Sequence, residues 1–271
     1  AQERVAEHMK SLGTNVMLVF PGSQSAGGVR MGAQTGQMLT EDDALAIARD
    51  VPEVQVAAPA SRATTQVVAG NTNWLTYVIG TTNDFLEARE WTLEAGRIFE
   101  AGELQGSGKV GLIGRTAALE LFGDADPLDQ VVRVRNVPIT IVGTLVPKGE
   151  NANGQDQDDV LLVPISTLRN RIQGGNAGKL RRIGWINVKV REGQSMKDAE
   201  DGIRELLRQR HRVQPGADDS VRVRNLTEVL QAQEASSRVM TLLLGAVAGV
   251  SLVVGGIGIM NIMLVSVTER T

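Results

Sequence analysis

The sequence has 271 residues, a length that predicts one or two globular units. With 28 Lys and Arg against 31 Asp and Glu, its net charge of −3 lacks the basic excess that binding to nucleic acid needs. The absence of cysteine excludes disulfides and thiolate chemistry, and the two histidines, His8 and His211, are too few for a multi-histidine metal site.

The charged residues are unevenly distributed, because 239–267 contains no Asp, Glu, Lys or Arg. As a helix, these 29 residues would extend about 43 Å, which exceeds the ~30 Å hydrocarbon core of a bilayer. We therefore predict a transmembrane helix over this segment. Gly245, Gly249 and Gly256 fall on one face of it, where small residues let helices approach closely. Asn261 is a polar residue that prefers a partner helix to lipid, so we expect all of these residues to pack against other membrane helices.

Two β-α-β units are predicted from the helix and strand signals. In the first, Thr40 and Asp43 make the capping-box pattern that opens a helix, and Pro52 ends that helix. In the second, Ser195 and Asp198 open a helix whose basic last turn suits the negative end of its dipole. The expected elements are, in chain order, a helix end over 1–12, a strand over 15–20, a loop over 23–37, the helix from 41, a strand from 54, a strand over 183–190, the helix from 196 and a strand over 221–224.

The two units are separated by about 110 residues that do not continue the β-α-β pattern. We expect this stretch, 72–182, to be an inserted subdomain, since domains are commonly inserted into one another where the ends of the insert lie close together. Its predicted elements are strands over 74–80, 110–114, 131–145 and 160–163 and helices over 84–89 and 116–122. The sequence therefore predicts an α+β fold in which 13–71 and 183–225 form one subdomain and 72–182 is inserted into it.

A single long helix is predicted to start at Asn225 and to continue through the hydrophobic segment. No proline occurs in 225–267, and the first glycine there is Gly245. Residues 226–238 would form a stalk of about 20 Å between the folded part and the membrane. A stiff rod of this kind transmits displacement, whereas a Gly-Ser linker would not.

Candidate catalytic and metal sites have weak sequence support. The segment 102–109 differs from a phosphate-binding loop, because its glycines are one residue too far apart and no Ser or Thr follows the lysine. Asp156, Asp158 and Asp159 offer oxygen ligands for a hard cation but lack EF-hand spacing, which favours a solvated loop. His211, in the last turn of a helix, suits the helix dipole better than acid–base catalysis. We therefore predict that the chain is not an enzyme and holds neither metal nor cofactor.

Short motifs are spread along nearly the whole chain. They are Leu12-Gly13-Thr14-Asn15 with Pro21-Gly22, Leu39-Thr40 with Asp43, Gly96-Arg97, Leu121-Phe122-Gly123 with Asp126-Pro127-Leu128, Gly154-Gln155-Asp156-Gln157-Asp158-Asp159 before Val163-Pro164, Leu206-Leu207-Arg208 with Arg210-His211, and Gly255-Gly256-Ile257-Gly258-Ile259-Met260-Asn261 before Thr268-Glu269-Arg270-Thr271. In this order the set resembles the MacB-type family of ABC transporter permeases. One departure is Asp129, where the family tends to have glycine.

The resemblance implies a large extracytoplasmic domain between the first and second of four helices in the bacterial inner membrane. In that plan the β-α-β units form a porter-like part, the insertion is sabre-like, and the stalk and membrane helix follow. Glu269, Arg270 and Thr271, within 268–271, resemble the start of a cytoplasmic coupling segment that meets the ATPase. The chain would then be a fragment of the permease, without an ATP-binding motif of its own.

The function implied by the resemblance is that of a permease subunit. It would transmit ATP-driven conformational change to its extracytoplasmic domain for efflux of drugs, peptides or similar substrates. The expected partners are an ABC ATPase that binds ATP and magnesium, a second permease copy, the lipid bilayer, and a periplasmic adaptor with an outer-membrane duct. Gln155, Asp156, Asp158 and Asp159 are the candidates for a partner-binding loop.

Other functions remain open from the sequence. Lipoprotein-releasing and cell-division permeases share the same general plan. A membrane-anchored sensor domain that signals to a kinase or cyclase is the alternative from a different class, and the segment after Thr271 discriminates the two. Further membrane spans there favour the permease, and a signalling domain favours the sensor. A membrane-anchored hydrolase has little support, because there are two histidines and no nucleophile-elbow motif.

Overall fold

The structure is a computed structural model. It describes residues 15–22, 25–26, 29–30, 38–151, 154–174, 181–214, 219, 221–225, 239–241, 243–244, 248 and 251. The chain forms two compact units, Ala1–Thr227 and Glu228–Thr271. The predicted helix end over 1–12 and the predicted stalk over 226–238 lie outside the described residues.

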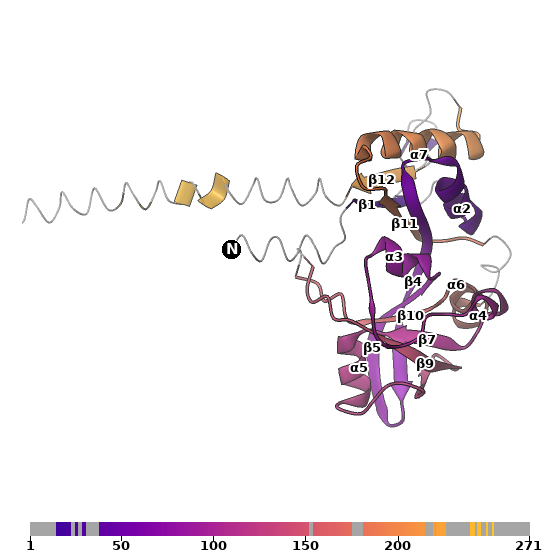
Figure 1. Ribbon diagram of the computed structural model, residues 1–271, viewed down its shortest axis with the longest axis vertical. Helices are drawn as coiled ribbons and strands as arrows, with labels where there is room; N and C mark the ends of the chain where they lie inside the picture. The colour runs from indigo at the N-terminus through magenta and orange to yellow at the C-terminus, as the bar shows by residue number, and fades with distance from the viewer. Residues whose placement is uncertain are drawn as a thin grey trace, which may run out of the picture. The chain divides into compact units, whose positions relative to one another are not determined.

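Two interlocked β-α-β units form one half of the first compact unit (Figure 1). The first consists of β1 (Val16–Pro21), α2 (Glu41–Asp50) and β4 (Val54–Ala69), and the second of β11 (Trp185–Val190), α7 (Met196–Arg210) and β12 (Val221–Asn225). The strand order β12-β1-β11-β4, with every neighbouring pair antiparallel, places one strand of each unit between the two strands of the other. This is a split β-α-β arrangement of the ferredoxin type, and we call this part the ferredoxin-like half.

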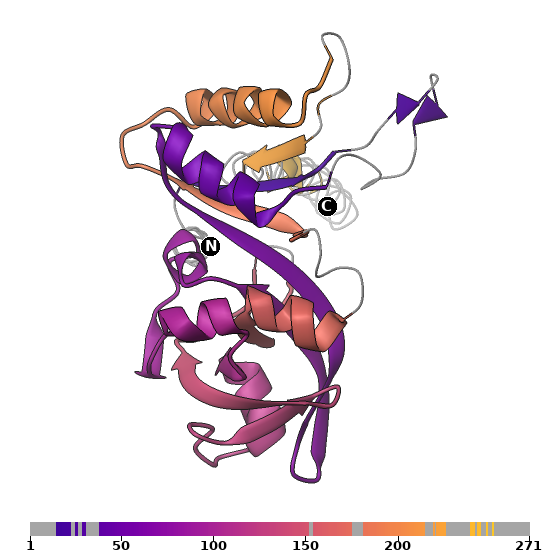
Figure 2. The ribbon, with the colours of Figure 1, turned by 90° about the vertical axis from the view of Figure 1, so that its right-hand side faces the viewer.

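The core of the ferredoxin-like half lies between the four strands and the two helices. Figure 2 shows α2 and α7 on the same side of the strands. Side chains from β1, β11, β12, α2 and α7 join one cluster, which includes Met17, Val19, Ile47, Ile186, Val188, Ile203, Leu207 and Val221. The alternation of β11 and the helical spacing of α7 therefore direct their apolar side chains to the same place.

Both helices begin with the side-chain caps that the sequence predicts. The N–H of Asp43 donates to Oγ1 of Thr40 at 3.3 Å, and the N–H of Thr40 donates to Oδ2 of Asp43 at 3.0 Å. At the start of α7, Oγ of Ser195 accepts from the N–H of Asp198 at 3.2 Å. These bonds satisfy N–H groups that have no partner within the helix, so the two predicted helix starts are confirmed.

A closed ring of six strands forms the other half, which we call the barrel half. Its strands are the second part of β4, β5 (Thr72–Thr81), β10 (Val160–Pro164), β7 (Val110–Ile113), β9 (Val137–Leu145) and β8 (Val131–Val134). β4 pairs with β5, and the order continues through β10, β7 and β9 to β8, which pairs back onto β4 at Val67 and Val68. The ring leaves no open strand edge around its circumference.

The strands of the ring separate two cores by simple alternation. In β10, Leu161 and Val163 join one cluster with side chains of β4, β8, β9 and α5, whereas Val160 and Leu162 join a second cluster on the opposite face. The second cluster also contains Phe85 and side chains from the first part of β4. β4 thus continues from one half into the other, and it packs on both of its faces.

The remaining elements connect the strands of the barrel half. They are α3 (Asp84–Ala88), β6 (Leu93–Gly96), α4 (Ala101–Gly106), α5 (Arg115–Phe122), α6 (Ile165–Thr167) and the π-helix η1 (Leu168–Gln173). α3 and α5 confirm two predicted helices, but α4 and the helical stretch 165–173 were not predicted. The single strand predicted over 131–145 is wrong, because Arg135 adopts a φ of +49° and turns the chain between β8 and β9.

Two loop regions have a defined backbone structure, one within 23–37 and one at Asp129. Within the loop predicted over 23–37, β2 (Ser25–Ala26) and β3 (Val29–Arg30) pair as two-residue strands. Asp129, which stands where the resembling family tends to have glycine, adopts a φ of +59°, and its N–H donates to the carbonyl of Ile141 at 2.8 Å. Aspartate tolerates this left-handed conformation better than most residues, so the turn forms without glycine.

The two halves are joined by more than the β4 strand. Arg169 of η1 forms an ion pair with Glu41 at the start of α2, and both side chains are largely buried. Lys189 of β11 pairs with Glu90, just after α3, at 2.8 Å. The mixed α+β class is confirmed, whereas the subdomain boundaries drawn from the sequence stay a prediction.

Candidate functional site

The candidate loop lies between β9 and β10, and the structure describes it at 149–151 and 154–159. Its outer end is a tight turn, since the N–H of Asn151 donates to the carbonyl of Gln155 at 2.8 Å. An isolated bridge between Glu150 and Asp156 continues the pairing toward the base. The loop is therefore a short hairpin rather than the unpaired solvated loop that its composition favours.

Asp158 fastens the base of this hairpin. It is buried, and its carboxylate accepts the N–H groups of Lys148 and Gly149, both at 2.8 Å. Its own N–H donates to Oδ1 of Asp156 at 2.7 Å. A carboxylate that accepts two backbone N–H bonds is expensive to replace, because each donor would lose its partner. We infer a structural role for the Asp158 carboxylate.

Two other side chains tie the hairpin to neighbouring elements. Oδ1 of Asp159 accepts from Nε1 of Trp74 on β5 at 2.9 Å, and Oε1 of Gln157 accepts from Nη2 of Arg89 at 2.9 Å. Among the predicted partner-binding residues, Gln155 and Asp156 are exposed, whereas Asp158 and Asp159 are engaged inside the domain. Partner binding by this loop stays a prediction, and its exposed side is formed by Gln155 and Asp156.

Two cations lie beneath the hairpin, and no motif of the sequence indicates them. Nζ of Lys148 donates to the carbonyl of Arg89 at 2.5 Å and lies 5.8 Å from the centre of the Trp91 ring. Burial lowers the pKa of Lys148 to about 8, and the nearby charge of Arg89 adds to the effect. Burial also lowers the pKa of Arg89. Because these residues are distant in sequence, no local pattern signals their proximity.

A second polar cluster joins α2 to α7. Asp43 accepts from Nε of Arg210 at 2.9 Å and lies 3.2 Å from Nε2 of His211. Burial by itself raises the pKa of Asp43, but hydrogen bonds from His211, Arg210 and Thr40 together hold it well below its usual range. His211 therefore ends α7 against a buried carboxylate, a contact that its position in the last turn did not predict.

Across the described ranges, there is no group of three or more His, Asp or Glu side chains that could hold a metal ion. Likewise, within those ranges no helix is both long and apolar enough to span a bilayer. The described residues of 239–251 are helical, and Val239, Met240, Leu243 and Leu244 expose more than half of their surface.

The predicted membrane-packing and coupling residues are not described. Gly245, Gly249, Gly256 and Asn261 lie outside the described residues, as do Glu269, Arg270 and Thr271. The predicted transmembrane helix over 239–267 is described only in part, and its role stays a prediction.

Comparison with known proteins decides the family. A model of the MacB-like periplasmic core domain matches residues 1–206. The chain belongs to this family. Relatives named macrolide export ATP-binding/permease protein MacB are 35% identical in Syntrophobacter fumaroxidans, over 96% of this chain and 43% of the relative, and 38% identical in Rhodospirillum rubrum, over 100% and 40%. The chain thus spans about two fifths of the length of these relatives.

Solved structures agree with the MacB-like fold. The periplasmic region of MacB from Actinobacillus actinomycetemcomitans matches with a TM-score of 0.66 at 24% identity, covering 85% of this chain and 98% of that one. The extracellular domain of the transporter YknZ from Gram-positive bacteria matches with a TM-score of 0.59 at 16% identity, covering 78% and 100%. At these identities the likeness shows the fold alone, and it agrees with the family assignment.

Proposed function

We propose that this MacB-like chain is the extracytoplasmic domain, stalk and second membrane helix of an ABC transporter permease. In this proposal it transmits ATP-driven motion from the cytoplasmic side of the bacterial inner membrane to its extracytoplasmic domain. The motion drives efflux of drugs, peptides or similar substrates. ATP and magnesium bind elsewhere, in an ATPase domain or subunit that Glu269, Arg270 and Thr271 help to contact.

The relatives support this proposal because the match continues beyond the core domain. Alignment with the Rhodospirillum rubrum protein covers 100% of the chain, which includes the uncharged segment 239–267. That relative is named as both ATP-binding protein and permease. Two fifths of its length corresponds to this chain, which leaves room for the ATPase and for further membrane helices in the rest.

One observation of the fold carries the proposal. β1, through which the chain enters the domain, and β12, through which it leaves, are neighbouring antiparallel strands, and Met17 pairs with Asn225. The two connections leading out of the domain therefore start side by side at one end of the sheet. This arrangement suits a domain placed between two consecutive membrane helices, because both connections then lead away from the same end of the sheet.

A route for displacement follows from the strand order. Motion applied to β1 and β12 passes directly to β11 and β4 through antiparallel ladders. β4 is 16 residues long and extends into the ring of the barrel half. We propose that the ferredoxin-like half contributes to the porter-like part of the family and the barrel half to the sabre-like part.

The proposed assembly contains several partners. A second permease copy would pack against the glycine face of the membrane helix, formed by Gly245, Gly249 and Gly256, with Asn261 facing a helix rather than lipid. A periplasmic adaptor, with an outer-membrane duct, would contact the extracytoplasmic domain. Gln155 and Asp156 are the exposed candidates for such a contact on the β9–β10 hairpin.

An insertion in the stalk tests the proposed coupling. Two glycines inserted after Gln233 of the intact transporter should interrupt the predicted rigid helix between membrane and domain. We expect export to fall at least about tenfold while ATP hydrolysis continues. A change of about this factor corresponds to the loss of a typical coupling free energy between two sites. The measurements are substrate export from cells and ATPase activity of the purified transporter in lipid.

The matched control inserts two glycines after Arg135, in the turn between β8 and β9. This insertion has the same composition but lies away from the stalk, so export and ATPase activity should both persist. Full export by the stalk variant would contradict the proposed role of the helix as a lever.

A further inference from the structure

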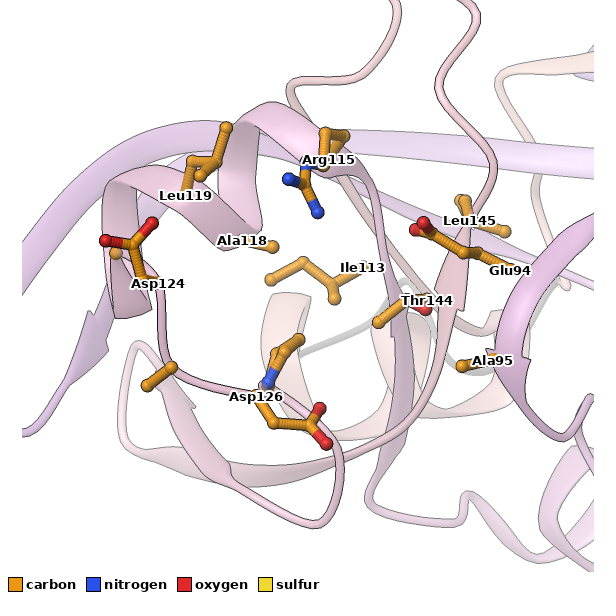
Figure 3. Close-up of a pocket in the computed structure, with 13 residues that line it drawn as sticks. Glu94, Ala95, Ile113, Arg115, Ala118, Leu119, Asp124, Asp126, Thr144 and Leu145 are labelled. Atoms are coloured by element: carbon orange, nitrogen blue, oxygen red, sulfur yellow. The ribbon is translucent and has the colours of Figure 1, made fainter.

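A pocket of about 370 Å³ opens in the barrel half beside β6 (Figure 3). One wall is the first turns of α5, with Arg115 and Leu119, and the opposite wall is Glu94 of β6. Ile113 at the end of β7 and Thr144 near the end of β9 form its floor. Its volume is at the small end of the range of about 300–1,000 Å³ that is usual for ligand sites.

The pocket combines an apolar interior with a charged rim. Ile113 and Leu145 are buried, whereas Glu94, Asp124 and Asp126 are exposed around the opening. Arg115 is the one cation among the lining residues, so three carboxylates face one guanidinium. Figure 3 shows the Arg115 guanidinium and the Glu94 carboxylate directed into the space from opposite walls.

Most of the charged groups around the pocket form no polar contact within the described part of the domain. In the described part of the chain, the side chains of Glu94, Arg115 and Asp124 have neither a hydrogen bond nor an ion pair. Asp126 uses one oxygen to accept the N–H of Leu128 at 2.9 Å, and its second oxygen lies at the exposed rim. The rim is therefore open to a ligand whose charge is complementary.

β6 provides an open strand edge next to the pocket. Among the described strands it pairs with β9 alone, and it ends the strand order of the sheet. Glu94, Ala95 and Gly96 are exposed along it. Gly96 ends the strand with a φ of +85°, and a Cβ there would lie 2.3 Å from the carbonyl oxygen of Val142. An open strand edge is a template for pairing with an extended segment of another chain.

We propose that β6 and the adjoining pocket bind an extended segment of a partner protein that carries a lysine or arginine. The main chain of the segment pairs with the open edge of β6. Its basic side chain crosses Ala95, a small residue that leaves the pocket accessible from the edge, and its aliphatic stem lies in the pocket, where Leu119 is an exposed apolar lining residue. The charged group is then held by Glu94, Asp124 and Asp126.

Charge balance selects this occupant over the alternatives. With three carboxylates and one guanidinium, the rim attracts a cation and repels a purely anionic segment. Arg115 provides donors for a carbonyl group of the bound segment, so it contributes to recognition without reversing the charge preference. The inference goes beyond the proposed function and does not depend on it, because it concerns one surface of the barrel half.

Peptide binding to the full-length transporter in detergent tests the proposal. The probe is a fluorescein-labelled peptide, about eight residues long, of alternating threonine and valine with one central lysine. Norleucine replaces the lysine in a second peptide, and glutamate replaces it in a third. A fourth and a fifth peptide keep the lysine. In the fourth, N-methyl groups block the amides along one edge of the extended peptide, and in the fifth they block the amides along the opposite edge. Only one of these two peptides keeps the edge that pairs with β6. Fluorescence anisotropy measures each dissociation constant.

The dissociation constant of the lysine peptide should be about threefold to tenfold lower than those of the norleucine and glutamate peptides. Methylation of one edge, and not of the other, should abolish binding. The double variant Glu94→Gln with Asp124→Asn should lose the preference for lysine. The matched control, Glu120→Gln with Glu192→Gln, removes the same charge from exposed positions outside the pocket and should keep it.

Each opposite outcome overturns the proposal. These outcomes are equal binding of the lysine and norleucine peptides, tighter binding of the glutamate peptide, an unchanged lysine preference in the pocket variant, and no binding at about 1 mM peptide. Because all substituted positions are exposed, a thermal melt by circular dichroism should show that both double variants are folded.

Discussion

Aliphatic side chains fill the core of both the ferredoxin-like half and the barrel half, but the chain packs more closely at glycines in the barrel half. In the ferredoxin-like half, two helices cover one face of four strands, and large aliphatic side chains such as Ile47 and Ile186 fill the space. In the barrel half, main chain approaches main chain. A Cβ on Gly114 would lie 2.3 Å from the carbonyl oxygen of Asp158, and one on Gly96 would lie 2.3 Å from the carbonyl oxygen of Val142.

The two halves also differ in how much of their secondary-structure pattern lies within a short stretch of sequence. Each β-α-β unit of the ferredoxin-like half contains its own strand, helix and strand, so its pattern is visible within a short stretch of sequence. Strand pairing joins distant segments in both halves, since β1 pairs with β11 and β12 in the ferredoxin-like half, and β4 pairs with β8 and β5 with β10 in the ring. Yet β4 belongs to both halves, and we expect them to unfold together.

Truncation of one core isoleucine in each half tests that expectation and should have the largest effect. Ile186→Ala in the ferredoxin-like half and Ile141→Ala in the ring each remove a fully buried side chain and leave a cavity. Each should lower the free energy of unfolding by about 2–5 kcal/mol. Urea titration of the purified chain in detergent, followed by tryptophan fluorescence and circular dichroism, measures the change.

Both variants should shift one and the same transition, because the shared strand makes the halves one cooperative unit. Separate transitions, with each substitution moving only one of them, would show that the halves are independent despite β4. The wild-type titration under the same conditions is the reference.

A carboxylate substitution sharpens the comparison within the barrel half. Asp158→Ala leaves the N–H groups of Lys148 and Gly149 without their acceptor. Because the backbone at this base is only partly covered, we expect a loss of about 1–3 kcal/mol in the free energy of unfolding. Gln155→Ala, at the exposed end of the same hairpin, is the matched control and should change it by less than about 0.5 kcal/mol. An equal effect of the two substitutions would refute the fastening role of Asp158.

The smallest expected effect is the contribution of Lys148 to the pH dependence of the free energy of unfolding. Because the pKa of Lys148 is lowered to about 8, the unfolded chain holds more protons than the folded chain between about pH 8 and the usual lysine pKa of 10.5. The free energy of unfolding should therefore rise with pH in this window, and the destabilisation by charged Lys148 is fully present below pH 8. Lys148→Met should remove this part of the rise in a series of urea midpoints from pH 7 to 10.

Lys197→Met is the matched control for the pH series, because it removes one positive charge from an exposed position on α7 in the other half. If Lys148→Met and the wild type show the same dependence on pH, the proposed contribution of burial at Lys148 is wrong.

The sequence by itself determined the features that depend on neighbouring residues. Thr40 with Asp43 and Ser195 with Asp198 specify helix starts, because a cap needs only residues three positions apart. The apolar alternation of β11 likewise identifies its buried face. The motifs spread along the chain indicated the family, and the domain match confirms that family.

Tertiary structure alone decided the features that depend on distant residues. The closure of the ring by β8 onto β4, and the burial of Lys148 beside Arg89, bring together segments that no local period relates. The same reason explains the loop at Asp156, Asp158 and Asp159, which looks uniformly solvated in sequence. Whether a carboxylate is exposed or fastened depends on which backbone N–H groups the fold places beside it, and the sequence pattern does not contain that information.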